Sequence, residues 1–211
     1  MMPRRSYDQY CAVARALDTV GERWTLLIVR ELLAGPRRYT DLHADLPGVS
    51  TDVLASRLKE MERDRLVTRR RLPPPGAAYV YELTPRGRDL LTVLGALAAW
   101  GTADLGEPRP TDAVRAHWAA VPLMRRLAAV PGLPGGVVEV RLDEGAFHIE
   151  LGGTAPSYAD GPAKSPDAVL ALPAGARALP DALGDGVAEV TGEGPLADAL
   201  RGAGARSGGI R

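Results

Sequence analysis

The chain of 211 residues has only one cysteine, Cys11, so it can form no disulfide within itself. A lone thiol fits a reducing compartment, and we expect a cytoplasmic protein. The basic amino terminus has no apolar segment behind it, which argues against a secretory signal. The densest apolar run, residues 90–100, is too short to span a bilayer. We therefore expect a soluble protein without a membrane partner.

Motifs that carry chemistry are also scarce. The three histidines, His43, His117 and His148, fall in different predicted elements, so the sequence predicts no metal site. There is no nucleophile elbow, phosphate-binding loop or zinc-protease motif. We therefore expect neither an enzyme nor a bound cofactor.

The net charge is zero, but the two halves of the chain differ in sign. Residues 1–101 contain 16 Lys and Arg against 12 Asp and Glu, whereas residues 102–211 contain 10 against 14. The length exceeds that of one small domain, and a Gly-Glu-Pro-Arg-Pro linker occupies 106–110. The sequence predicts two domains with different tasks, residues 1–105 and 106–211.

Residues 39–83 predict a helix, a turn, a second helix and a two-stranded wing. Pro47 and Gly48 end the first helix, and Ser50 is a suitable N-cap for the second. At helical spacing the core-facing stripe is Leu54, Leu58 and Met61. The opposite, polar stripe is Asp52, Ser56, Lys59 and Arg63, with Thr51 and Arg57 on the flanks. Such a face suits insertion into the major groove of DNA, although an ordinary solvated helix shows the same pattern.

The wing strengthens the DNA-binding interpretation. Arg69, Arg70 and Arg71 follow one another on its first strand, before a prolyl turn and a second strand over 78–83. Adjacent like charges on a strand favour a polyanionic partner, although arginine is also common on edge strands. Together these elements predict a winged helix-turn-helix.

The segment from Cys11 to Trp100 resembles the HxlR-type regulators of the MarR-like winged-helix class. The matching motifs, in order, are Cys11, Gly21–Thr25, Gly35–Tyr39, Leu46–Ser50, Leu54, Arg57–Leu58, Glu62, Tyr81–Gly87 and Trp100. The chain departs from that pattern at Met61, usually leucine, and at Arg65, usually glycine. The resemblance implies a DNA-binding transcriptional regulator. It also implies that a cysteine near position 11 senses oxidants or electrophiles; an inert, small apolar side chain is the alternative.

The predicted DNA contacts fall into two groups. We expect Thr51, Asp52 and Ser56 to meet base edges, and the basic residues to meet phosphates or the minor groove. For Arg37 and Arg38, ahead of the first helix, a solvated loop is the alternative. The predicted set is Arg37, Arg38, Tyr39, Ser50, Thr51, Asp52, Ser56, Arg57, Lys59, Arg69, Arg70 and Arg71.

Helices are also predicted over residues 8–20, 24–33 and 84–100. The last has more apolar surface than one small domain covers. We expect a homodimer formed through the Asp8–Val20 and Thr84–Trp100 helices, which would present two recognition helices to successive grooves. Coverage by the second domain is the alternative.

The second half predicts an α+β domain, which makes the whole chain α+β. The predicted elements are a helix over 111–129 interrupted at Pro122, strands over 137–142, 146–151 and 168–172, a helix over 176–183, a strand over 186–191, a helix over 195–201 and a frayed tail from Gly202. This order is similar to the sterol-carrier-protein fold, which implies an apolar cavity for a lipophilic small molecule; a dry core is the alternative. The candidate cavity residues are Trp118, Phe147, Ile149 and Leu172.

These patterns favour a homodimeric, sequence-specific transcriptional regulator that binds double-stranded DNA and is modulated through the second domain or Cys11. A competing hypothesis is a lipid or small-molecule carrier whose winged helix serves dimerisation only. An enzyme that uses the second-domain pocket is a weaker third.

Overall fold

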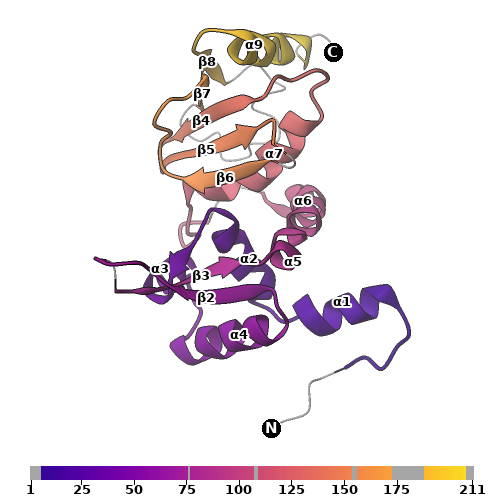
Figure 1. The fold of residues 1–211 in the computed structure, drawn as a ribbon. Coiled ribbons are helices and arrows are strands. Elements are labelled where there is room, and N and C mark those ends of the chain that lie inside the picture. Colours follow the sequence, from indigo (N-terminus) through magenta and orange to yellow (C-terminus); the bar gives the residue numbers. More distant parts are fainter. Residues whose placement is uncertain (1–5, 76, 107–108, 154–155, 173–187, 208–211) are drawn as a thin grey trace. The chain divides into compact units, whose positions relative to one another are not determined.

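The computed structural model describes residues 6–75, 77–106, 109–153, 156–172 and 188–207 (Figure 1). The chain divides into two compact units, Met1–Leu90 and Leu91–Arg211. Within the described residues, no helix combines the length and apolar character needed to cross a membrane.

The first unit combines helices with a small antiparallel sheet. Its elements are α1 (Ala12–Val20), α2 (Thr25–Leu33), β1 (Arg37–Arg38), α3 (Tyr39–Asp45), α4 (Thr51–Arg63), β2 (Val67–Arg71), β3 (Tyr79–Leu83) and α5 (Pro85–Arg88). Strand β3 lies between β1 and β2. Helix α2 packs against β3, and α4 packs against β2. The predicted helix-turn-helix and wing are therefore present, around a core that includes Ile28, Leu42 and Leu54.

Three details of the first unit differ from the sequence-based prediction. Helix α1 begins at Ala12 instead of Asp8, because the Tyr7 N–H donates to the Asp18 carboxylate and Asp8 has a φ of 53°. The helix predicted over 84–100 is interrupted at Asp89, which separates α5 from α6 (Leu90–Gly101). Strand β1 was not predicted, since two residues show no periodicity.

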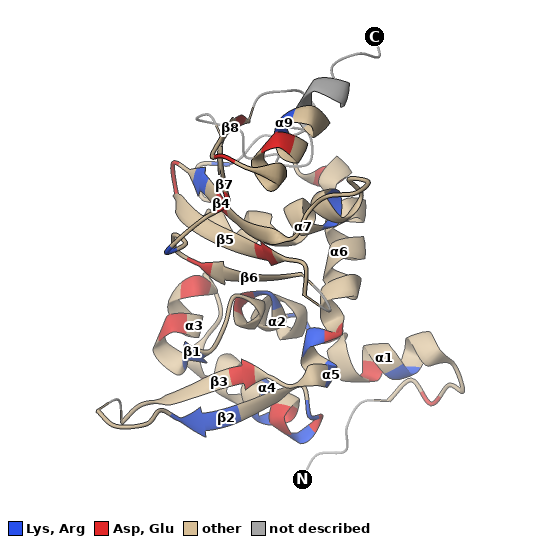
Figure 2. Cartoon of the chain, turned by 45° about the horizontal axis from the view of Figure 1, so that its top comes forward, with Lys and Arg blue, Asp and Glu red and all other residues tan. Residues whose placement is uncertain are grey.

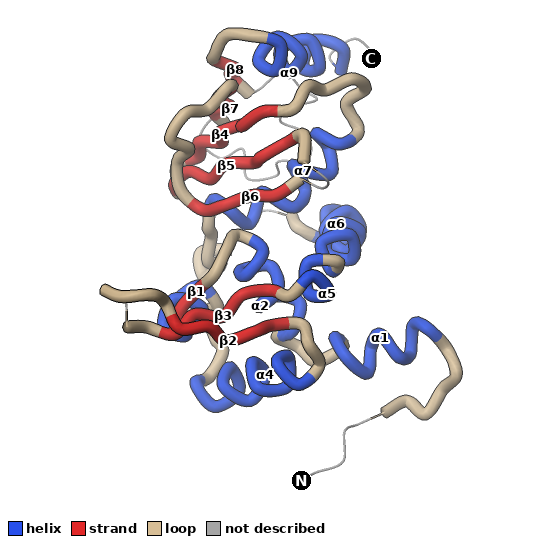
Figure 3. The backbone as a smooth tube through the Cα atoms, in the orientation of Figure 1, coloured by secondary structure: helices blue, strands red, loops and turns tan. Residues whose placement is uncertain are grey.

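The second unit contains a five-stranded mixed sheet (Figure 3). Its elements are α6, η1 (Thr102–Asp104), η2 (Ala116–Ala119), α7 (Ala120–Ala128), β4 (Gly136–Leu142), β5 (Gly145–Leu151), β6 (Ser157–Asp160), β7 (Ala168–Ala171), β8 (Glu189–Thr191) and α9 (Pro195–Ser207). The strand order is β6-β5-β4-β7-β8, and β4 and β7 are parallel. Helices η2 and α7 pack against β5, whereas α9 packs against β7 and β8.

Several predictions for the second unit need correction. The helix predicted over 111–129 begins as a 3-10 turn at Ala116 and continues as α7. Pro122 does not interrupt it, because it lies in the first turn of α7, where a missing N–H costs nothing. The tail predicted to fray from Gly202 stays helical to Ser207, and β6 was missed. The helix predicted over 176–183 and the start of the 186–191 strand lie outside the described residues.

Candidate nucleic-acid interface

Helix α4 has the features of a recognition helix. The Ser50 hydroxyl accepts a hydrogen bond from the Val53 N–H at 3.3 Å and so caps the first turn. Leu54, Leu58 and Met61 are buried. Each side chain of this kind contributes roughly 1.5–3 kcal/mol to folding. The buried stripe thereby fixes which side of α4 faces outward.

The turn between α3 and α4 is short, and buried side chains and hydrogen bonds stabilise it. Gly48 has a φ of 86°, a left-handed conformation that favours glycine. Leu46 and Val49 are buried, and the Val49 N–H donates to the Leu46 carbonyl at 3.2 Å. The Tyr39 hydroxyl donates to the Thr51 carbonyl at 2.7 Å. Tyr39 therefore joins the start of α3 to the start of α4.

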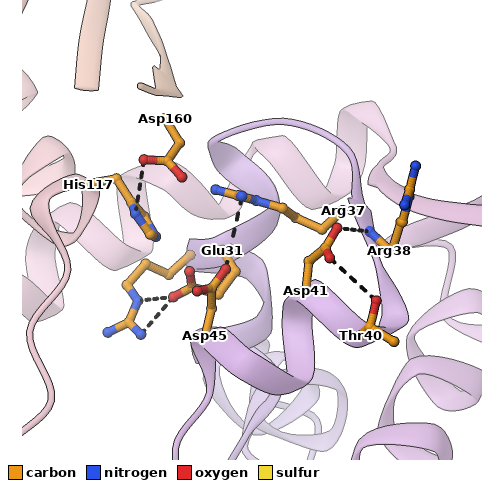
Figure 4. A network of polar contacts seen from close by, with 9 residues as sticks. Glu31, Arg37, Arg38, Thr40, Asp41, Asp45, His117 and Asp160 are labelled. Atoms are coloured by element: carbon orange, nitrogen blue, oxygen red, sulfur yellow. Dashed lines mark hydrogen bonds and ion pairs between the residues drawn. The ribbon is translucent and has the colours of Figure 1, made fainter. Parts of the chain in front are cut away.

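The two arginines ahead of α3 lie in different surroundings (Figure 4). The Arg38 N–H donates to the Asp41 carboxylate at 3.2 Å, while the residue itself is exposed. The Arg37 guanidinium lies 4.0 Å from the Asp45 carboxylate, and both side chains are largely covered. Arg38 is thus more accessible to a phosphate than Arg37.

The outward side of α4 carries the residues predicted to read bases. Thr51, Asp52 and Ser56 are exposed there, as is Lys59 further along the helix. Lys59 forms no ion pair with any residue that the structure describes. Val53 is exposed as well. Sequence reasoning passed over Val53 because a valine beside the Leu54 stripe is typical of the core.

Arg57 lies at the edge of this surface, where carboxylates surround it. Its guanidinium contacts Glu60 at 2.5 Å and Glu22 at 3.6 Å, and 15% of its side chain is exposed. A phosphate contact by Arg57 stays a prediction. Such a contact would require the guanidinium to leave both partners.

The three wing arginines also differ from one another. Strand β2 carries a continuous basic segment (Figure 2). Arg70 is bonded to the Glu82 carboxylate on β3, with nitrogen–oxygen distances of 3.2–3.3 Å. Arg69 stacks over the Tyr79 ring, 4.0 Å from its centroid. Arg71 is exposed and forms no ion pair within the described part of the chain.

Tyr81 lies opposite Arg69 in the register of the wing. Burial raises the pKa of the Tyr81 phenol, although the nearby Arg69 opposes the rise. The hydroxyl is therefore neutral at physiological pH and can donate a hydrogen bond. The sequence places Tyr79 and Tyr81 on the second wing strand, and Tyr81 in a family motif, but their position beside Arg69 becomes visible only from the strand register.

The junction between α4 and the wing is a tight C-terminal cap. The Leu66 N–H donates to the Met61 carbonyl at 2.9 Å and the Arg65 N–H to the Glu62 carbonyl at 3.1 Å, the Schellman pattern. Arg65 has a φ of 57°, in the left-handed region. The Thr84 hydroxyl donates to the Arg65 carbonyl at 2.6 Å. These bonds fix the angle at which the wing leaves the recognition helix.

Cys11 is exposed and occupies the N-cap position of α1. The backbone N–H groups of Ala14 and Val13 stabilise its thiolate and lower the pKa of the thiol. The structure therefore leaves Cys11 accessible to reagents.

The predicted ligand residues gather around one face of the second sheet. Phe147 and Ile149 lie on the same face of β5. Leu172, just after β7, continues the side-chain alternation of Leu170, whose strand partner Val140 also pairs with Phe147. Trp118 lies on η2, which packs against β5. Phe147 and Ile149 are completely buried and Leu172 is nearly so. A cavity for a lipophilic molecule among these residues stays a prediction.

The opposite face of this sheet carries a buried carboxylate. Glu139 accepts hydrogen bonds from the Arg141 guanidinium at 2.6 Å and from the Ala163 N–H at 2.9 Å.

On η2, the His117 ring lies 3.5 Å from the Asp160 carboxylate (Figure 4). Among the described residues, no three His, Cys, Asp or Glu side chains form a group that could hold a metal ion.

Comparison with known proteins identifies the family. Residues 19–108 match the model of the HxlR-like helix-turn-helix family. The HTH-type transcriptional regulator YvaP of Bacillus subtilis is 39% identical over 88 residues, which cover 82% of that protein and 42% of this chain. This chain belongs to the HxlR-like helix-turn-helix family.

Further members of the HxlR-like family match the same half of the chain. The regulator YodB of Bacillus subtilis is 36% identical over 85 residues, covering 76% of YodB and 40% of this chain. A solved structure of quinone-bound YodB matches with 34% identity and a TM-score of 0.38, covering 94% of that chain and 44% of this one. The relatives are transcriptional regulators, and the family match ends at residue 108.

Proposed function

We propose that this HxlR-like protein is a sequence-specific DNA-binding regulator of transcription that acts as a homodimer. The observation that carries the proposal is the exposed polar face of α4, capped at Ser50 and adjoined by the basic strand β2, in a family of helix-turn-helix regulators. In the proposed complex α4 enters the major groove and the wing lies along the sugar-phosphate backbone.

The proposed contacts divide by chemistry. Thr51, Asp52 and Ser56 read base edges, and Asp52 accepts a hydrogen bond from a cytosine amino group. Lys59 and Arg71 meet phosphates, which their exposure and lack of ion pairs among the described residues support. Arg38 and Arg69 add positive charge at the edge of the proposed DNA-binding surface.

A selection experiment tests this function. The full-length protein is incubated with a randomised pool of DNA duplexes, and the bound fraction is sequenced. We expect a two-fold symmetric motif with half-sites about one helical turn apart, and we expect Ser56→Ala to change the preferred bases. Recovery of no motif, or of the same motif by Ser56→Ala, would count against the proposed role of α4 in reading the base sequence.

The proposed homodimer uses helices α1 and α6. Large apolar side chains are exposed on both, at helical spacing: Val13 and Leu17 along α1, and Val93, Leu97 and Trp100 along α6. Tyr10, just before α1, is exposed as well. Exposed apolar stripes of this kind mark interfaces. Burial against a second copy would remove them from water.

Sedimentation measures the dimer directly. Val13→Glu places a charge in the apolar stripe of α1 and should shift the protein toward monomer. Ala12→Glu adds the same charge to the same helix outside the stripe, so it should leave the dimer intact. Equal behaviour of the two variants would show that α1 is not at the interface.

Two routes of regulation are proposed. One is oxidation or alkylation of Cys11, which its exposure and lowered pKa support. The other is binding of a lipophilic molecule between the second sheet and η2, which the shared phase of Phe147, Ile149 and Leu172 supports. Measuring DNA release by a quinone, with Cys11→Ser as the control, tests the first route. The carrier hypothesis remains the rival if the full chain binds a lipophilic ligand but no DNA.

A further inference from the structure

Arg57 differs from Lys59, the next cation along α4, in its surroundings. It contacts Glu60 one turn along the same helix and Glu22 on a different element, whereas Lys59 is exposed and unpaired within the described residues. Only 15% of the Arg57 side chain is exposed. The Arg57 guanidinium is therefore less available to a phosphate than the exposed Lys59 ammonium.

The backbone of Glu22 is part of a tight turn between α1 and α2. The Gly21 N–H donates to the Leu17 carbonyl at 2.8 Å, and the Thr25 N–H donates to the Glu22 carbonyl at 3.0 Å. Thr25 starts α2, whose Ile28 is completely buried. The backbone of Glu22 is therefore held in the turn that leads into a core helix, and its half-exposed side chain reaches Arg57 from there.

The bridge from Glu22 to Arg57 acts on the orientation of α4. An i, i+3 pair such as Arg57–Glu60 stays within one helix and cannot resist rotation of that helix. A second carboxylate on α2's side does resist it, because rotation about the helix axis separates the two groups. Thr51 and Ser56 turn with α4, so their approach to base edges depends on the same rotation.

We propose that Arg57 is a positioning residue, which holds the recognition helix at the angle that sequence reading requires by bridging Glu22 and Glu60. The proposal rests on the proposed DNA-binding function. It assigns Arg57 to specificity and leaves the phosphate contacts to Lys59 and the wing.

The two roles predict opposite effects of neutralising Glu22. On electrostatic grounds alone, removal of a negative charge near the interface tightens binding to every duplex. If Glu22 orients Arg57, however, Glu22→Gln weakens binding to the preferred duplex and leaves binding to unrelated duplexes nearly unchanged. Arg57→Lys separates the roles again, since lysine keeps a charge for a phosphate but cannot span two carboxylates as a guanidinium does.

The experiment uses the full-length protein and two duplexes: the one selected from the randomised pool, and a scrambled version of it. We expect Glu22→Gln, Arg57→Gln and Arg57→Lys each to lower the affinity ratio between these duplexes about three- to tenfold. The salt dependence of binding should not change, and the Glu22→Gln/Arg57→Gln double variant should be no worse than the Arg57 variant alone. Glu62→Gln removes a carboxylate of the same helix that does not contact Arg57, and it serves as the matched control.

Thermal unfolding of each variant accompanies these measurements, so that loss of fold is not taken for loss of specificity. The proposal is overturned if Arg57→Lys binds like the wild type while Arg57→Gln flattens the salt dependence, or if Glu22→Gln tightens binding to both duplexes. Those results would leave the proposed function intact and make Arg57 a phosphate contact. If the wild-type protein selects no duplex, the proposed function fails, and this inference fails with it.

Discussion

Arg65 occupies a backbone conformation that disfavours its own side chain. With a φ of 57°, it caps α4 at the position where the resembling regulators usually have glycine. A left-handed conformation costs a residue with a Cβ about 1–2 kcal/mol. The Met61–Leu66 and Glu62–Arg65 hydrogen bonds and the Thr84 hydroxyl hold Arg65 there in spite of this cost.

We therefore predict that Arg65→Gly stabilises the first unit. The relief of strain exceeds the entropy that glycine gains in the unfolded chain, and the net gain is about 0.5–1 kcal/mol. Chemical denaturation of the full chain measures it. Arg63→Gly, inside the last turn of α4, is the control and should lose about 1 kcal/mol. A loss of stability in Arg65→Gly would contradict the strain argument.

Cys11 is predicted to react faster than an unstructured cysteine. Because the Ala14 and Val13 N–H groups lower its pKa, a larger thiolate fraction is present at pH 7. The rate of alkylation by iodoacetamide, followed as pH rises, should reach its midpoint below that of a short peptide with the same local sequence. Identical midpoints would show that α1 does not activate the thiol.

At the scale of elements, the sequence predicts what depends on local chemistry. Helix α4 begins where Ser50 caps it, and the wing strands lie on either side of the prolyl turn, as predicted. The short strand β1 could not be predicted from the sequence, because it is defined only by its pairing with β3. The covering of Arg57 escapes it as well, since Glu22 reaches α4 only after the helices have packed.

The wing prediction distinguishes two adjacent arginines. Arg71→Ala should weaken binding to all duplexes and lower the slope of log affinity against log salt by about 0.9 for each phosphate that is no longer neutralised. Arg70 and Glu82 neutralise each other, so Arg70→Ala combined with Glu82→Ala should leave that slope unchanged. The slopes come from binding titrations at several salt concentrations. If the double variant lowers the slope and Arg71→Ala leaves it unchanged, Arg70 leaves Glu82 when DNA binds.

For the whole molecule, we predict that the response to a lipophilic effector depends on the second unit. The family match ends at residue 108, and the predicted ligand residues all lie beyond it. A chain ending at Gly106 should retain DNA binding and lose any change in affinity caused by a lipophilic compound that affects the full chain. Typical coupling free energies are about 1–3 kcal/mol, so the effect is readily measured by titration. A shortened chain that still responds would place the sensor in the winged-helix half.

The parallel pairing of β4 with β7 also has a consequence for the order of folding. Strand β4 meets β5 through a tight hairpin, which forms within about 1–10 microseconds, whereas its other edge stays open until β7, later in the chain, pairs with it. During that interval the Val137–Val140 edge presents unpaired backbone groups on an apolar strand. We therefore expect partly folded chains to associate edge to edge with other copies at this stage.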